Sequence, residues 1–179
     1  MNKTPDSGAA PQRLGRGMIV AAWLLLLALL TWFFNESLNR QHNPNQLVMT
    51  AMSADGQPEV RLKRNRFGHY VATGQINSQP VVFMLDTGAT DVSVPLPVAE
   101  KLGLEKGQPV QYRTANGTIR AWQTVIDEIR LGDLGIGPVR ASINPGTQGD
   151  EILLGMSFLK HLDFKQQGDT LTLRPPARH

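Results

Sequence analysis

From about residue 46 onward, apolar and polar positions alternate in short stretches that end at turn residues. Three pairs of such stretches flank a turn: QLVMTAM and PEVRLKR around Asp55-Gly56, HYVATGQI and PVVFMLD around Asn77-Ser78-Gln79, and PVQYRTA and TIRAWQTVI around Asn116-Gly117. Asp-Gly and Asn-Gly dipeptides between alternating stretches are typical of β-hairpins. The pattern therefore predicts three hairpins.

Further short elements complete this pattern. DEIRL and VRASI flank the glycine-rich connector GDLGIGP, and DTLTLR predicts a last short strand. Helical signals are brief: PVAEKLG has proline in its first turn and ends at Gly103, and GMSFLKHL is a second candidate. Many short strands with little helix predict an all-β, closed barrel-like domain over residues 46–175, with one or two short helices.

The longest apolar stretch, MIVAAWLLLLALLTWFF, covers residues 18–34 and carries no charge. As a helix it spans about 25 Å, near the short end of what crosses a bilayer. A cleaved signal peptide is the alternative, because basic residues before an apolar core describe that segment too. However, no small-residue cleavage pattern follows, and Trp32, Phe33 and Phe34 suit a membrane interface. We therefore expect an uncleaved transmembrane helix.

Charge on the two sides of this helix predicts its orientation. Three basic residues lie within residues 1–17, and Arg40 alone lies close after the helix. The positive-inside rule then places the N-terminal segment in the cytoplasm and the domain outside. In a bacterium with two membranes, this predicts a single-pass inner-membrane protein with a periplasmic domain. Residues 35–45 are polar and end in Asn-Pro-Asn, which predicts a tether.

Composition removes several classes of chemistry. The chain has no cysteine, which excludes thiol nucleophiles, disulfides and thiolate metal sites. Its four histidines show no spacing that places two on one face, so we expect no metal site and no cofactor. The net charge is +3, and the basic cluster at residues 61–66 alternates with apolar positions like the solvent face of a strand. A nucleic-acid partner is therefore not expected.

Two short motifs match known catalytic or nucleotide-binding patterns only in part. GMSFL, residues 155–159, begins like a serine-hydrolase nucleophile elbow but lacks the closing glycine. GDLGIG, residues 132–137, has its glycines in the wrong order for a dinucleotide loop and connects two strands. A helix start and a turn, respectively, are the better interpretations.

One aspartate follows five apolar residues in VVFMLDTGATDVSVP, residues 81–95. Asp-Thr-Gly by itself is compatible with a plain turn, because aspartate and glycine favour turns. The flanks argue against that interpretation, since Val81 to Leu85 predict a buried strand before Asp86 and Val92 to Val94 return the chain to the interior. Burying an unpartnered carboxylate is costly, so a chain that places one here is expected to use it.

The stretch FMLDTGAT resembles the active-site turn of the retropepsin-like aspartic proteases. A second signature of that family, an apolar pair followed by glycine near a C-terminal helix, is matched by ILLGMSFL at residues 152–159. With an apolar helix in front, the chain is similar to the membrane-anchored bacterial branch of the family from about Val60 to Arg174. The resemblance implies a retropepsin-like acid-protease barrel lobe, preceded by one transmembrane helix, that hydrolyses peptide bonds.

This resemblance assigns roles to particular residues, and Asp86 is the implied catalytic carboxylate. The active-site turn continues with Thr87, Gly88, Ala89 and Thr90, and the second signature comprises Leu153, Leu154 and Gly155. Thr87 is expected to bond across a dimer, and Gly88 to offer its N–H to the carboxylate. The candidate flap, a hairpin tip that closes over a bound peptide, consists of Thr114, Ala115, Asn116, Gly117 and Thr118.

One departure from the family concerns charge. Viral retropepsins pair an acidic residue with an arginine at the positions that Thr90 and Met156 occupy here. Since neither residue is charged, the viral ion-pair network is not expected in this chain.

Peptide hydrolysis of this type needs two carboxylates that share one proton. The chain has one Asp-Thr-Gly, so the resemblance implies a homodimer in which each copy contributes Asp86 at a two-fold axis. The last strand, residues 170–174, is expected to pair between the subunits. The predicted protein is a membrane-anchored aspartic endopeptidase that acts on peptides or proteins.

Two other interpretations stay open at the level of sequence. A catalytically silent, membrane-anchored module for dimerisation or peptide binding would keep the fold, although it has no need for the Asp86 carboxylate. A structural periplasmic protein whose turn reads Asp-Thr-Gly by chance is the other. Peptide cleavage and oligomeric state distinguish the three.

Overall fold

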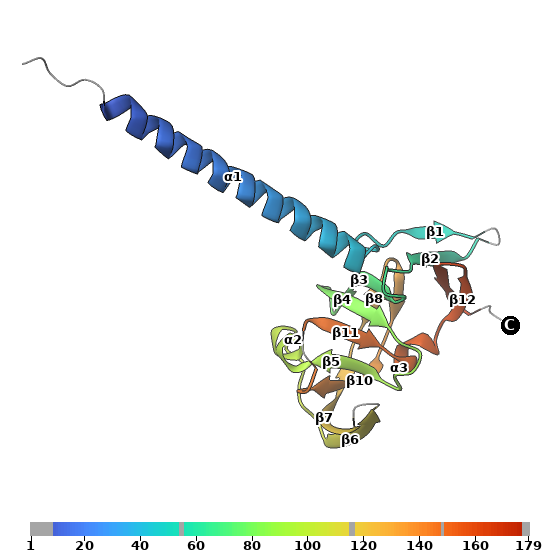
Figure 1. Ribbon diagram of the computed structural model, residues 1–179. Coiled ribbons are helices and arrows are strands. Elements are labelled where there is room, and N and C mark those ends of the chain that lie inside the picture. The colour runs from blue at the N-terminus through green and yellow to red at the C-terminus, as the bar shows by residue number, and fades with distance from the viewer. Residues whose placement is uncertain (1–8, 54–55, 115–116, 148, 177–179) are drawn as a thin grey trace, which may run out of the picture. The chain divides into compact units, whose positions relative to one another are not determined.

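The computed structural model describes residues 9–53, 56–114, 117–147 and 149–176, with backbone only at residues 9–16 and at Thr114. The chain divides into two compact units, of which the first ends at Asn39 and the second begins at Arg40. Within its described residues, the second unit contains thirteen strands and two short helices (Figure 1). The domain is therefore mostly β, as the alternation in its sequence predicts.

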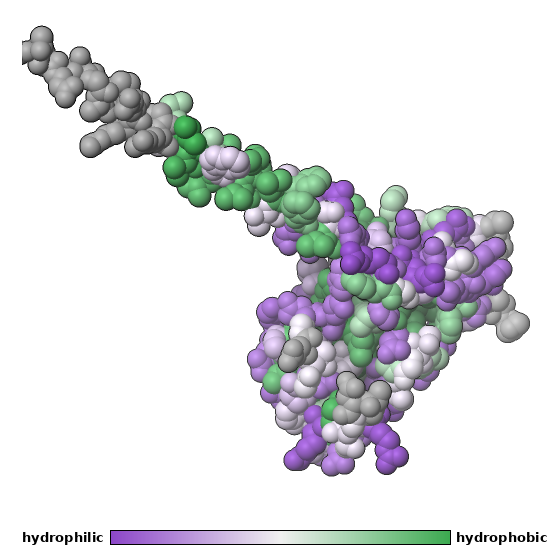
Figure 2. All heavy atoms as spheres, viewed as in Figure 1, coloured by the Kyte–Doolittle hydropathy of each residue, from purple (hydrophilic) through white to green (hydrophobic). Residues whose placement is uncertain are grey.

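Helix α1, Ala9–His42, contains the predicted apolar segment. Its stretch Gly17–His42 is long and apolar enough to cross a membrane, and its most apolar part is not buried against the rest of the described chain. Figure 2 shows apolar side chains along this helix. α1 extends beyond residues 18–34 at both ends, and on the C-terminal side it ends just before Asn43, because the following Pro44 disfavours helical backbone there.

A nine-stranded sheet forms the centre of the domain. In spatial order its strands are β6 (Pro109–Thr114), β7 (Gly117–Ile126), β10 (Val139–Asn144), β5 (Val92–Pro95), β11 (Glu151–Leu154), β4 (Gln79–Leu85), β3 (Tyr70–Ile76), β8 (Ile129–Leu131) and β9 (Leu134–Ile136). β4 pairs parallel with β11, and β5 pairs parallel with β10. These parallel pairs bring segments that are distant in the sequence side by side (Figure 1).

A second sheet has four antiparallel strands in the order β1 (Thr50–Met52), β2 (Pro58–Lys63), β13 (Thr170–Arg174) and β12 (Asp163–Gln167). The expectation that the last strand pairs between subunits is wrong, because β13 lies between β2 and β12 of its own chain. β12, which the sequence did not predict, takes an outer position. Its residues are exposed along its whole length.

The three predicted hairpins are present as the antiparallel pairs β1–β2, β3–β4 and β6–β7. Between β3 and β4, Asn77 and Ser78 have φ angles of 48° and 66°. Two successive residues with positive φ are the mark of the tight hairpin turn that matches the twist of antiparallel strands. The connector at residues 132–138 contains an additional strand, β9, which pairs with β8.

Two short helices pack on the core at the predicted places. α2, Leu96–Lys101, has proline in its first turn and ends before Gly103, whose φ of 68° favours glycine. α3, Met156–Leu159, buries Phe158 and Leu159. Phe83 and Phe158 are among the largest fully buried side chains, so the second signature and the strand before Asp86 share one core.

The segment predicted as a tether differs from a free linker. Residues 35–42 continue α1, and Asn43 and Asn45 are each 7% exposed. The Asn45 side chain donates to the carbonyl oxygens of Lys63 (2.9 Å) and Val71 (2.7 Å) and accepts from the Lys63 N–H (2.7 Å). Asn45 therefore joins the end of β2 to β3, and the folded domain begins earlier in the chain than the sequence predicts.

Candidate active site

Asp86 stands at the end of β4, directly after Leu85. Its side chain is half-buried, and Thr87 and Gly88 after it are exposed in a turn. The Gly88 N–H donates to Asp86 Oδ1 (2.8 Å), and the Ala89 N–H donates to the Asp86 carbonyl oxygen (3.2 Å). The turn therefore supplies one carboxylate oxygen with a backbone donor, which is the bond that we expected from Gly88.

The second signature lies beside this turn. β11 runs parallel to β4 with Leu154 opposite Leu85, and the Asp86 N–H donates to the Leu154 carbonyl oxygen (3.2 Å). A main-chain hydrogen bond therefore connects Asp86, the candidate catalytic residue, to the second signature. The two motifs, far apart in the sequence, form one site.

Close packing explains the glycine of the second signature. A Cβ atom on Gly155 would lie 2.4 Å from the Asp91 carbonyl oxygen and 2.7 Å from that of Ala89. The next residue, Met156, donates its N–H to the same Ala89 oxygen (2.8 Å). A side chain at this position would push the second signature away from the active-site turn, so glycine is required for the approach of the two backbones.

Sequence reasoning missed a charged cluster just after the active-site turn. Asp91 is 7% exposed, and it accepts hydrogen bonds from Arg140 Nε (2.8 Å) at Oδ1 and from the Tyr112 hydroxyl (2.7 Å) at Oδ2. An ion pair is thus present, but not at the positions of Thr90 and Met156. One signal in the sequence could have indicated this cluster. Asp91 precedes the apolar residues of DVSVP, where the chain re-enters the core, and a carboxylate at such a position needs a partner.

The partners of Asp91 keep their protons over the pH range of most enzymes. Burial, followed by the hydrogen bond to Asp91 and the charge of that carboxylate, raises the pKa of Tyr112 to about 12. The hydrogen bond to Asp91 and its charge also raise the pKa of Arg140 above its ordinary value. Tyr112 therefore remains an O–H donor, and Arg140 remains a cation.

A cavity of about 400 Å³, here called the groove, opens beside Asp86. Its lining residues are Asp86, Gly88, Ala89, Thr90, Asp91, Ser93, Tyr112, Arg113, Ile119, Ser142, Asn144 and Leu153. They come from the active-site turn, the second signature, hairpin β6–β7 and strands β5 and β10. A lining of carboxylates among apolar and hydrogen-bonding side chains is typical of ligand-binding sites.

A second cavity of about 380 Å³, here called the notch, shares Asp86 with the groove. Its lining residues are Tyr70, Leu85, Asp86, Thr87, Leu159, Phe164, Gln166, Leu171 and Leu173. Most of them are apolar, and the Phe164 side chain on β12 is 45% exposed. The Tyr70 hydroxyl is buried and has no hydrogen-bond partner within the described part of the chain.

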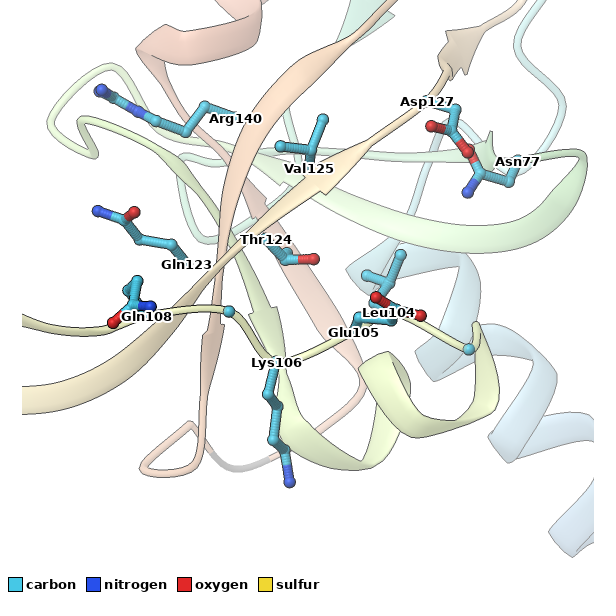
Figure 3. A pocket seen from close by; sticks show the side chains of 12 residues that line it. Asn77, Leu104, Glu105, Lys106, Gln108, Gln123, Thr124, Val125, Asp127 and Arg140 are labelled. Atoms are coloured by element: carbon cyan, nitrogen blue, oxygen red, sulfur yellow. The ribbon is translucent and has the colours of Figure 1, made fainter.

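A larger cavity, about 630 Å³, contains none of the predicted site residues. Figure 3 shows Asn77 and Asp127 at one side of it, and Gln108 and Gln123 at the other. Its polar side chains include no member of either family motif. Chemistry rather than size therefore points to the groove and the notch as the site.

The candidate flap is the tip of hairpin β6–β7. Ala115 and Asn116 lie outside the described residues, as does the side chain of Thr114, so the assignment of a flap stays a prediction. Gly117 has a φ of 110°, and Thr118 is exposed. In Figure 1 this hairpin lies at the opposite end of the domain from β1 and β2. Residues just before and after its tip line the groove.

Comparison with known proteins places these motifs in a family. A family model described as "gag-polyprotein putative aspartyl protease" matches residues 72–161, half of the chain. An uncharacterized protein in the cobV 5' region of Sinorhizobium sp. is 29% identical over 175 residues, which cover 90% of this chain and 75% of that protein. An uncharacterized protein of Rickettsia prowazekii (strain Madrid E) is 29% identical over 119 residues, covering 64% of this chain and 51% of that protein.

A solved structure agrees with the family match. The crystal structure of a retropepsin-like aspartic protease from Rickettsia conorii has a TM-score of 0.54 and 26% identity, covering 72% of this chain and 95% of that chain. The matched family segment contains both Asp86 and Gly155, the two motifs that the pairing of β4 with β11 brings together. On these grounds, the chain belongs to the retropepsin-like aspartic protease family.

Proposed function

We propose that this protein is a membrane-anchored aspartic endopeptidase that hydrolyses peptide bonds as a homodimer. The observation that carries the proposal is the position of Asp86, whose carboxylate accepts the Gly88 N–H and borders both the groove and the notch. The groove offers room for a peptide, and the notch offers an apolar face to a second copy. Membership of the family supports the class of reaction.

In the proposed mechanism, two Asp86 carboxylates at a two-fold axis share one proton, because like charges about 3 Å apart do not both ionise. The ionised carboxylate takes a proton from a water molecule, whose oxygen attacks the carbonyl carbon of the peptide. The protonated carboxylate gives its proton to the carbonyl oxygen. The tetrahedral intermediate then breaks at the C–N bond, and the amine leaves with a proton from the pair.

Three features support the dimer. Retropepsin-like proteins are typically dimers. The notch leaves Phe164 partly exposed beside Asp86 and Thr87. β12 is an outer strand of its sheet in the described chain, and an exposed outer strand offers unpaired main-chain groups to another copy. We expect the two notches to face each other, which would also allow Thr87 to bond across the axis.

The anchoring part of the proposal rests on α1. Its apolar stretch Gly17–His42 is long enough to span a bilayer, and the excess of basic residues before it favours a cytoplasmic N-terminus. In this proposal the protein is a single-pass inner-membrane protein of a bacterium, with the domain in the periplasm. Its substrates are then peptides or proteins that reach the periplasmic side.

A paired cleavage assay tests the proposal. The full chain and its Asp86→Asn variant, both in detergent micelles, are incubated with a library of decapeptides between pH 4 and pH 7. Wild type is expected to cleave a subset of peptides. Asp86→Asn is expected to reduce the rate by about a thousandfold, because an amide cannot act as general acid or base. Asp133→Asn, which removes an exposed carboxylate outside the groove and the notch, is the matched control and is expected to keep full activity.

Equal absence of cleavage by wild type and Asp86→Asn would reject the peptidase. The result would then favour a silent, membrane-anchored dimerisation or peptide-binding module if the chain still dimerises. A monomer at high concentration, measured by sedimentation, would instead favour a structural protein. Equal cleavage by both variants would point to a contaminating protease.

A further inference from the structure

The wall of the groove contains a bonded cluster that links three parts of the fold. Asp91 follows the active-site turn, Tyr112 lies on β6, and Arg140 lies on β10. Both carboxylate oxygens of Asp91 are used, since Oδ1 accepts from Arg140 Nε at 2.8 Å and Oδ2 accepts from the Tyr112 hydroxyl at 2.7 Å. Asp91 is 7% exposed, so the cluster is part of the wall rather than a free charge in the groove.

Strand β6 has few other connections to the body of the domain. It is the outer strand of the nine-stranded sheet, and its main-chain pairing in that sheet is with β7, its own hairpin partner. β7 pairs with β10 from Trp122 to Ile126, so the described part of the hairpin nearer the tip has no further strand beside it and can bend away from the sheet. The hydroxyl of Tyr112 gives β6 a direct bond to the segment that follows Asp86, and therefore fixes the distance between the hairpin and the active-site turn.

The other side of the cluster is anchored in the second signature. The Ser157 hydroxyl accepts the Val92 N–H (2.9 Å) and donates to the Arg140 carbonyl oxygen (2.8 Å). Gly155 packs against the Asp91 carbonyl oxygen at a distance that leaves no room for a Cβ atom. The residues that hold Tyr112 are thus themselves held by α3 and β5, which belong to the well-packed core.

We propose that Tyr112 is a positioning residue that, through its bond to the Asp91–Arg140 pair, holds hairpin β6–β7 over the active-site turn in the position that binds substrate. The proposal rests on the proposed peptidase function and adds a determinant of substrate binding to it. In this proposal Asp91 is a structural part of the groove wall. Its two carboxylate oxygens accept hydrogen bonds from Tyr112 and Arg140, so Asp91 does not act as a charged partner for a bound peptide.

Hydrogen exchange of the full chain in detergent micelles tests the positioning without any knowledge of the substrate. Tyr112→Phe keeps the ring and removes the O–H donor. Amides of residues 110–114 and 117–122 are expected to exchange about tenfold faster, because a hydrogen bond to a charged group is lost, while β3 and β4 stay unchanged. Arg140→Gln is expected to act in the same direction. Arg130→Gln, on β8, breaks a similar surface pair between Arg130 and Glu128 (2.7 Å) and is the matched control.

Kinetics separate positioning from a merely structural role. With the decapeptide that wild type cleaves fastest, Tyr112→Phe is expected to raise KM about tenfold and to change kcat by less than about twofold. The double variant with Asp91→Ala is expected to be no worse than Asp91→Ala alone, since that change already removes the acceptor of the Tyr112 hydroxyl.

Three results would overturn the proposal: unchanged exchange in the hairpin, faster exchange with an unchanged KM, or additive effects of Tyr112→Phe and Asp91→Ala. If wild type cleaves no peptide, the peptidase function fails on its own. The exchange experiment then still decides whether Tyr112 holds the hairpin.

Discussion

The two tyrosines of the chain border the two cavities that share Asp86, and their hydroxyls are in opposite situations. In the groove, Tyr112 donates to the Asp91 carboxylate. In the notch, the Tyr70 hydroxyl is buried and finds no partner among the described residues. A buried polar group without a partner costs about 1–3 kcal/mol, so a chain rarely leaves one without reason.

The two cavities therefore differ in whether one chain alone satisfies the polar groups and covers the apolar side chains that line them. The groove is closed by bonds within one chain, from the second signature through Asp91 to hairpin β6–β7. The notch is lined by apolar side chains, leaves Phe164 partly exposed and lies next to the outer strand β12. In the proposed function, the single chain forms the wall of the groove by itself, and a second copy would cover the other side of Asp86.

The largest expected effect comes from disrupting the groove wall at Gly155. Gly155→Ala puts a Cβ atom 2.4 Å from the Asp91 carbonyl oxygen, so the backbone has to move. We expect a loss of about 3 kcal/mol in the free energy of unfolding, together with loss of peptide cleavage. Chemical denaturation followed by circular dichroism measures the first, and the decapeptide assay measures the second.

Gly146→Ala is the control for this change. Its Cβ atom would lie 3.4 Å from Asn144 Oδ1, an ordinary contact, and its backbone does not require glycine. Unchanged stability is expected there. A Gly155→Ala protein as stable as wild type would contradict the close packing on which the groove depends.

The next largest effect is expected from a change in the notch. Phe164→Asp puts a charge on the rim of the notch and removes apolar area that a second copy would bury. Because both copies lose this contact, the dissociation constant of the dimer is expected to rise about a hundredfold, while the monomer stays folded. Sedimentation in detergent measures this. Phe67→Asp, at a phenylalanine outside the notch that is 58% exposed against 45% for Phe164, is expected to leave the dimer intact.

If Phe164→Asp and Phe67→Asp have the same effect on association, the notch is not the contact surface. The dimer would then have to form elsewhere on the molecule.

The smallest effect sharpens the comparison between the tyrosines. Tyr70→Phe removes a hydroxyl that makes no bond in the described chain, so the free energy of unfolding of the monomer is expected to rise by about 1 kcal/mol. Tyr112→Phe is expected to lower it. Thermal unfolding at low protein concentration measures both. Destabilisation of the monomer by Tyr70→Phe would mean that the notch is as complete as the groove.

Local patterns in the sequence predicted much of this fold. The three hairpins follow from alternation around turn dipeptides, and the short helices follow from proline and glycine at their ends. Asp86 and Gly155 could be found because each belongs to a short motif, and the structure adds that the parallel pair β4–β11 places the two motifs together.

What the sequence did not predict depends on residues that meet only in three dimensions. Asp91, Tyr112 and Arg140 come from three separate elements, and nothing in their local patterns pairs them. β13 pairs with both β2 and β12 of its own chain, and the sequence did not indicate this because β12 was not predicted. β12 itself has no alternation of burial that would identify it as a strand.

The bonds of Asn45 bear on any processing of the chain by other proteases. Asn45 joins the end of β2 to β3, and the Asn43 side chain donates to Thr73 Oγ1 (3.0 Å). Cleavage on the C-terminal side of Asn45 would separate Asn45 from the domain, and β2 and β3 would lose the hydrogen bonds that its side chain makes to Lys63 and Val71. A shed form of the domain that keeps these bonds must therefore begin at or before Asn43.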